Sequence, residues 1–145
     1  MELDSTLLRQ TCRPAEFKNS LLNLRTAQHL VQLMFKERGI GLAANQAGLD
    51  LRLFVMFVEN EIFHCFNPEI VESSTETVSM AEGCLSFPGE RCEITRSARI
   101  QTRFYNSRGD LHEREFEGIA ARCFQHELDH LNGITMHQRL QVTND

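Results

Sequence analysis

Apolar side chains recur at helical spacing over positions 14–38, and this pattern predicts a long N-terminal helix. Pro14 suits the first turn of such a helix, where its missing N–H leaves no bond unmade. Gly39 is a natural stop at the other end. The recurring apolar positions are Phe17, Leu21, Leu24, Val31, Met34 and Phe35. Their spacing is typical of a helix with one buried face.

The middle of the chain carries patterns typical of strands. Apolar runs over 51–58 and 62–66 flank a polar turn, and we expect them to form a hairpin. The segment 69–78 alternates weakly between apolar and polar positions. The later stretches are a long predicted strand over 92–105, a turn cluster at 106–110 and a strand over 111–116.

A second helix is predicted to begin at Gly118 and to end at Asn132-Gly133. Its apolar residues lie on more than one face, which indicates a buried helix. They are Ile119, Ala120, Cys123, Phe124, Leu128 and Leu131. Strands between a first and a last helix predict an α+β fold, with antiparallel β-sheets packed around this buried C-terminal helix.

This second helix holds an HExxH pentad at 126–130. His126 and His130 lie one helical turn apart on the same face, so both imidazoles can hold one divalent metal ion. Glu127 between them can reach a water on that metal and act as its general base. A surface helix with two solvated histidines would carry the same pentad. The apolar flanks favour burial, and buried His and Glu side chains need partners.

A catalytic metal site also needs a third protein ligand and an open position. Downstream of the pentad, His137 is the only histidine and there is no glutamate. We therefore expect the third ligand upstream, and the segment 82–89 is the best candidate. Gly83 and Pro88-Gly89 mark a special, rigid backbone there, and Cys84 could offer a thiolate.

Composition narrows the classes of partner. The chain has 145 residues, 41% hydrophobic and 24% charged, which suits one globular domain over 1–145. Its net charge of −5 gives no basis for a nucleic-acid or anionic-membrane partner. No apolar stretch approaches a membrane span. The N-terminus lacks the features of an export signal and the five cysteines include no CxxC pair, so we expect reduced thiols and a cytoplasmic location.

Three motifs in order give the chain a close resemblance to the peptide deformylase family. They are GIGLAANQ at 39–46, EGCLS at 82–86 and QHELDHLNG at 125–133. The resemblance extends over nearly the whole chain. It departs from the family pattern at Asn45, where Pro or Thr is more usual.

The resemblance implies a metal centre and a set of catalytic groups. Cys84, His126 and His130 would bind one divalent metal, with Fe²⁺ as the physiological ion and Zn²⁺, Ni²⁺ or Co²⁺ as possible occupants. The pentad alone would have indicated zinc. By the same resemblance Glu127 is the general base. The groups that would stabilise the tetrahedral oxyanion are the Gln46 side-chain amide and the Leu85 backbone N–H.

The resemblance also implies a peptide-binding groove. Ile40 and Gly41 would pair with an extended substrate by strand addition. Cys123 would line the pocket for the methionine side chain, and Arg91 would form an ion pair with Glu82 beside it. Asp129 is expected either to support a metal-bound His or a nearby backbone group, or to form a surface salt bridge. The remaining cysteines are expected to be buried thiols: Cys12, Cys65 and Cys92. The remaining histidines are expected to be structural or exposed: His29, His64, His112 and His137.

The expected activity is hydrolysis of the N-formyl group from the N-terminal formylmethionine of newly made polypeptides, with release of formate. The expected partners are these nascent peptides and, in transient contact, the ribosome. The protein is expected to be a monomer with no membrane or sequence-specific nucleic-acid partner. A small HExxH zinc metallopeptidase and a catalytically inactive, peptide-binding member of the same fold are the alternatives.

Overall fold

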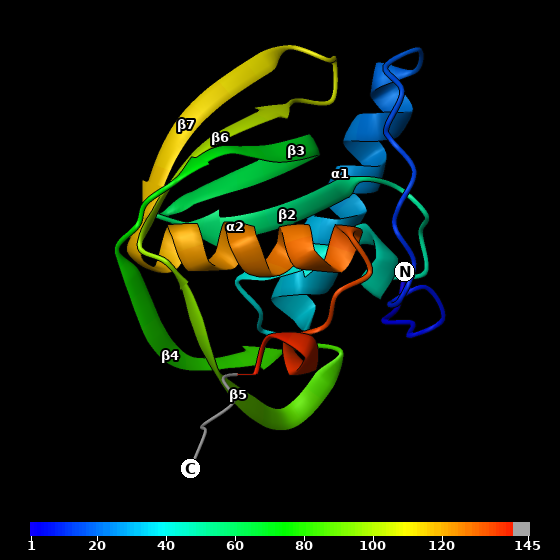
Figure 1. The fold of residues 1–145 in the computed structure, drawn as a ribbon. Coiled ribbons are helices and arrows are strands. Elements are labelled where there is room, and N and C mark those ends of the chain that lie inside the picture. Colours follow the sequence, from blue (N-terminus) through cyan, green and yellow to red (C-terminus); the bar gives the residue numbers. More distant parts are fainter. Residues whose placement is uncertain (141–145) are drawn as a thin grey trace.

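The computed structural model describes residues 1–140 and has two antiparallel sheets on either side of one central helix (Figure 1). The elements in chain order are α1 (Ser20–Lys36), β1 (Gly41–Ala43), the 3-10 helix η1 (Ala44–Gln46), β2 (Leu53–Val58), β3 (Glu61–Ser73), β4 (Thr77–Cys84), β5 (Phe87–Ser97), β6 (Arg99–Tyr105), β7 (Leu111–Glu117), α2 (Gly118–Leu131) and η2 (Met136–Arg139). The larger sheet has the order β1-β2-β3-β6-β7, and β4 pairs with β5 in the smaller one. Helix α2 contacts both sheets, so the predicted α+β class and buried C-terminal helix are confirmed.

Helix α1 is shorter than predicted at both ends. It begins after Asn19, whose side chain accepts a hydrogen bond from a backbone N–H of the first turn. The preceding residues are held elsewhere, because the Asn67 carboxamide bonds both the N–H and the C=O of Ala15 at 2.7 and 3.1 Å. Pro14 therefore lies outside the helix. The buried face of α1 also differs from the predicted stripe, because Leu21 and Phe35 are exposed. Its buried residues are Asn23, Ala27, Leu30, Leu33 and Met34.

The predicted hairpin over 51–66 is present as β2 and β3, but β3 continues to Ser73. The predicted single strand over 92–105 is wrong, because the chain changes sheets at Ala98. There the N–H of Ala98 bonds the carbonyl of Glu76 at 2.9 Å, which separates β5 from β6. Strand alternation is a local pattern and carries no record of which sheet a strand joins.

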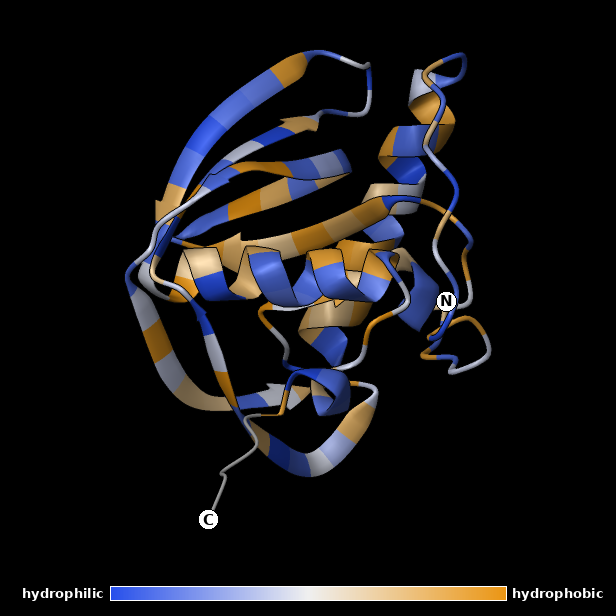
Figure 2. Ribbon diagram, viewed as in Figure 1, coloured by the Kyte–Doolittle hydropathy of each residue, from blue (hydrophilic) through white to orange (hydrophobic). Residues whose placement is uncertain are grey.

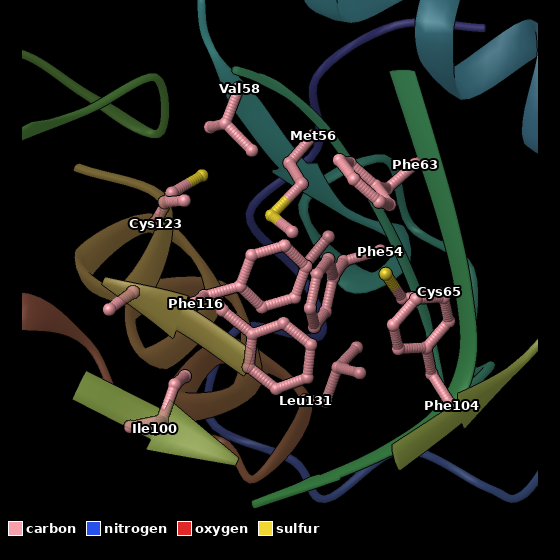
Figure 3. Close-up of a cluster of buried hydrophobic side chains, with 14 of the residues drawn as sticks. Phe54, Met56, Val58, Phe63, Cys65, Ile100, Phe104, Phe116, Cys123 and Leu131 are labelled. Atoms are coloured by element: carbon pink, nitrogen blue, oxygen red, sulfur yellow. The ribbon is translucent and has the colours of Figure 1, made fainter. Parts of the chain in front are cut away.

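Aromatic side chains fill the space between the larger sheet and α2 (Figure 3). Phe54 of β2 and Phe124 of α2 are fully buried, with ring centroids 4.9 Å apart in an edge-to-face arrangement. Phe116 of β7 packs against Phe124 as well. Polar and apolar residues alternate around α2 (Figure 2). The aromatic core thus anchors one side of the helix and leaves its other side for the polar pentad.

Candidate metal centre and groove

The structure brings the three predicted metal ligands together. Cys84 ends β4, and His126 and His130 lie on α2; their ligand atoms are all within 4.8 Å of one another. The Cys84 Sγ lies 3.3 Å from the His130 Nε2, and the two histidine Nε2 atoms are 3.2 Å apart. The β4–β5 pairing shifts register between Glu82 and Cys84. Such an irregularity re-aims side chains beside it.

Glu82 fixes the orientation of His126. Its Oε1 lies 2.8 Å from the His126 Nδ1, which leaves Nε2 facing the cluster. The same carboxylate accepts two hydrogen bonds from Arg96, at 2.5 and 3.0 Å, and one from Arg122. Arg122 also donates to two carbonyl oxygens of the smaller sheet. This buried Glu82 network therefore ties the smaller sheet to α2 at the position of one metal ligand.

Burial and charge shift the pKa values of these groups. Burial raises the pKa of Glu82, but hydrogen bonds from His126 and Arg96 outweigh it and lower the pKa to about 2. Burial lowers the pKa of His126, but bonds to Cys84 and Glu82 outweigh it and raise the pKa to about 10. Burial lowers the pKa of His130 to about 3 and raises that of Glu127 to about 7.

The predicted ion pair between Glu82 and Arg91 is wrong. Glu82 is already occupied by Arg96, Arg122 and His126. Arg91 is exposed and its Nη2 donates to the backbone carbonyl of Ala81 at 3.3 Å. It lies at the surface of the groove, where the neighbouring strand offers a carbonyl and not a carboxylate.

A cavity of about 740 Å³ opens beside the metal cluster between β1, β4, β5 and α2. Every predicted site residue except His130 lines it: Ile40, Gly41, Gln46, Cys84, Leu85, Arg91, Cys123, His126 and Glu127. His130 lies behind this surface and is 1% exposed. These residues therefore share the wall of one continuous groove.

Gly41 gives Glu127 its space. A Cβ at this position would lie 2.6 Å from the Glu127 Oε2 and 2.7 Å from the Cys123 Sγ. Cys123 also contacts the Ile40 carbonyl, with Sγ and O 3.7 Å apart. Since β1 forms one edge of the larger sheet, the backbone at Gly41 lies where an extended chain could add as a further strand.

Gln46 is held with its amide nitrogen toward the groove. Its Oε1 accepts from the backbone N–H of Ala43 at 2.9 Å, which orients the carboxamide. Its Nε2 lies 3.0 Å from the Ser86 hydroxyl and 3.5 Å from the Cys84 Sγ. Leu85 packs its side chain over Gly39 at the same edge. Ser86 is a contact that sequence reasoning missed.

Sequence reasoning also missed Arg96 and Arg122, to which it gave no role in the site. Arg122 lies one turn before His126 on a helix that is otherwise apolar around it, and that position was the available signal. Asp129 meets Arg96 at 3.0 Å and Arg139 at 3.0 Å. One of the two expectations for Asp129 was a surface salt bridge. It does form ion pairs, but its side chain is buried.

The other cysteines and histidines lie outside the metal cluster. Cys12, Cys65 and Cys92 are buried free thiols, as predicted. Among the histidines, His112 stacks on Phe104. Within residues 1–140, Cys84, His126 and His130 form the one cluster of potential metal ligands.

The sequence matches the family model described as polypeptide deformylase over residues 1–145. A peptide deformylase from Thermotoga neapolitana is 44% identical over 135 residues, covering 93% of this chain and 82% of that protein. The fold is similar to the crystal structure of peptide deformylase from Thermotoga maritima, with a TM-score of 0.90, 43% identity and coverage of 94% and 92% of the two chains.

A second solved structure is similar in fold and was determined with a peptide. It is a class I type b peptide deformylase from Acinetobacter baumannii, described as Met-Ala-Ser bound. It has a TM-score of 0.87 and 30% identity, and the match covers 92% of each chain. In this chain, no helix of the described part is both long and apolar enough to cross a membrane.

Proposed function

Because the chain belongs to the polypeptide deformylase family, we propose that it hydrolyses the N-formyl group of N-terminal formylmethionine in new polypeptides and releases formate. One observation carries the proposal for this chain. The cluster of Cys84, His126 and His130 lies beside Glu127 at the wall of a groove that a peptide can enter. The side chains of the two proposed catalytic residues, Gln46 and Glu127, are buried and line the same groove.

The residues fit the divalent metal that the family implies. A thiolate and two imidazoles suit Fe²⁺, Zn²⁺, Ni²⁺ or Co²⁺ better than Mg²⁺ or Ca²⁺. The buried Glu127 Oε1 has no hydrogen-bond partner among residues 1–140, as expected of a group that serves a reacting molecule. Fe²⁺ as the physiological ion is part of the proposal.

Cys84, His126 and His130 would hold the ion, which would supply a Lewis acid for the attacking water and the formyl carbonyl. Glu127 takes a proton from that water and passes it to the leaving amine. Gln46 donates its Nε2–H to the developing oxyanion, with its carboxamide oriented by Ala43. The Leu85 backbone N–H is the second proposed donor.

The substrate enters as an extended strand. The sheet edge at Gly41, the first residue of β1, supplies backbone hydrogen bonds. The carbonyl of the preceding Ile40 already accepts from the Phe57 N–H at 2.7 Å, and Cys123 lies against the same segment. The relative with Met-Ala-Ser bound supports a tripeptide of this kind as the product. Since polypeptides that begin with formylmethionine are made on ribosomes, we infer that the protein acts in the cytoplasm. We also propose that the protein acts as a monomer, with one domain over 1–145, and that it contacts the ribosome transiently.

Formate release tests the proposal directly. Protein purified without oxygen, with its metal quantified, should release formate from formyl-Met-Ala-Ser. It should act less well on acetyl-Met-Ala-Ser, because one misfitted methyl lowers kcat/KM by about 10–200-fold. Comparable values, or cleavage of an unformylated casein, would favour the metallopeptidase alternative. Metal occupancy without any formate release would favour the inactive peptide-binding alternative.

A further inference from the structure

Asn45 holds the last turn of α2 from within the core. It precedes Gln46 in η1 and is 0% exposed. Its Nδ2 donates to the backbone carbonyl of His130 at 2.5 Å and reaches the Leu7 carbonyl at 3.4 Å. Since both neighbours of Nδ2 are carbonyl oxygens, the orientation of this carboxamide is determined. Its Oδ1 must point away from them.

Two complementary atoms around His130 lack partners among residues 1–140. The buried Oδ1 of Asn45 needs a donor, and the buried Nδ1 of His130 has no acceptor. The His130 Nε2 faces Cys84 and His126, so a neutral imidazole that holds an ion there carries its proton on Nδ1. His126 differs, since its Nδ1 is matched by Glu82.

Metal-bound histidines nearly always donate their second N–H to a carboxylate, a carbonyl or a water, and this bond fixes the ring. Within residues 1–140, no carboxylate bonds the His130 ring. Asn45 already bonds the main chain of His130 through its side chain, and its Oδ1 is an acceptor without a partner among residues 1–140.

We propose that Asn45 is a positioning residue for His130: Nδ2 anchors its main-chain carbonyl, and Oδ1 accepts its Nδ1–H through one buried water when the ring faces a metal ion. This inference rests on the metal centre of the proposed function. The segment 39–46 would then orient two parts of the site: it carries the proposed oxyanion donor Gln46, and through Asn45 it positions the metal ligand His130.

The first test measures Zn²⁺ affinity by competition with a chelator. Asn45→Leu, which removes both polar atoms, should weaken Zn²⁺ binding by about 10–100-fold, the usual cost of losing a histidine's second partner. Asn23→Leu is the matched control, because Asn23 is also buried and its side-chain Nδ2 donates to the carbonyls of Glu16 and Ser107, away from the metal cluster. Its Zn²⁺ affinity should stay within about twofold of the native value. Equal affinities for the native protein and Asn45→Leu would overturn the inference.

The second test uses the native protein, so it does not depend on folding of a variant. In the Zn²⁺-loaded protein with ¹⁵N-labelled histidine, the Nδ1–H of His130 should exchange slowly and show proximity to the Asn45 side chain or a shared water. In Asn45→Leu this signal should shift or vanish, while that of His126 stays in place. A His130 Nδ1–H bonded to another group would overturn the inference. A native protein that binds no Zn²⁺ at this cluster would instead refute the metal centre itself.

Discussion

Replacing Glu82 with glutamine should destabilise the protein and weaken its metal centre together. In the native structure one carboxylate faces two guanidinium groups and one imidazole. The amide of Glu82→Gln keeps the shape but removes the charge, and its NH₂ group then points toward at least one donor. Arg122 loses its only carboxylate partner among residues 1–140, whereas Arg96 retains Asp129.

The magnitude follows from the burial of these groups. Removing one partner of a buried ion pair costs about 3–5 kcal/mol, because the remaining charge is left uncompensated. For a chain of about this length, each kcal/mol lowers Tm by about 2–4 °C, so the expected loss is about 6–20 °C. The loss of the Glu82 bond to His126 should also weaken metal binding by about 10–100-fold.

Guanidinium denaturation of the metal-free protein measures the stability, and chelator competition measures the affinity. Glu93→Gln is the control, since Glu93 lies on β5 of the same hairpin and is exposed; its effect should stay within about 0.5 kcal/mol. The difference between native protein and Glu82→Gln should also depend on pH. Because the pKa of Glu82 is lowered from 4.5 to about 2, its stabilisation is present above pH 4.5 and is lost as the pH falls toward 2. A loss below about 1 kcal/mol at neutral pH would refute the assigned network.

Three further changes test the site. Cys84→Ala should lose bound metal and activity together, whereas Cys12→Ser should keep its metal content; metal analysis after gel filtration decides this, and full occupancy of Cys84→Ala would remove it from the ligand set. Glu127→Gln should keep the metal but lose at least ~10²-fold in kcat, and a near-native rate would show that no base is needed. Gly41→Ala should lower kcat/KM by about 10²-fold, because its Cβ displaces the Glu127 carboxylate. An unchanged kcat/KM would mean that β1 moves aside without cost.

The features that could be predicted from sequence depend on residues close together in the chain. The pentad on α2 is an example, because helical spacing alone places His126 and His130 on one face. The hairpin of β2 and β3 is another, since two apolar runs flank one short turn. Cys84 required the family resemblance as well, because its approach to α2 depends on the irregular pairing beside Gly83.

The errors arose where distant contacts override a local pattern. Pro14 was expected in the first turn of α1, but Asn67 of β3 binds the backbone of the next residue, Ala15. The segment 92–105 was predicted as one strand from the spacing of Ile94, Ile100 and Phe104, yet Ala98 lies between two sheets. In both cases the deciding partner is tens of residues away, and neither periodicity nor a turn signal reports it.

The Glu82 network was missed for a related reason, and it shows how the fold builds the site. Charged residues are usually exposed, so Arg122 and Glu82, 40 positions apart, gave no sign of meeting. Their burial follows from docking the β4–β5 hairpin against the polar side of α2. That docking brings Cys84 to the two histidines. The ion pairs that hold the hairpin and the geometry that binds the metal are therefore parts of one contact, and a change that loosens the hairpin must also spread the ligands.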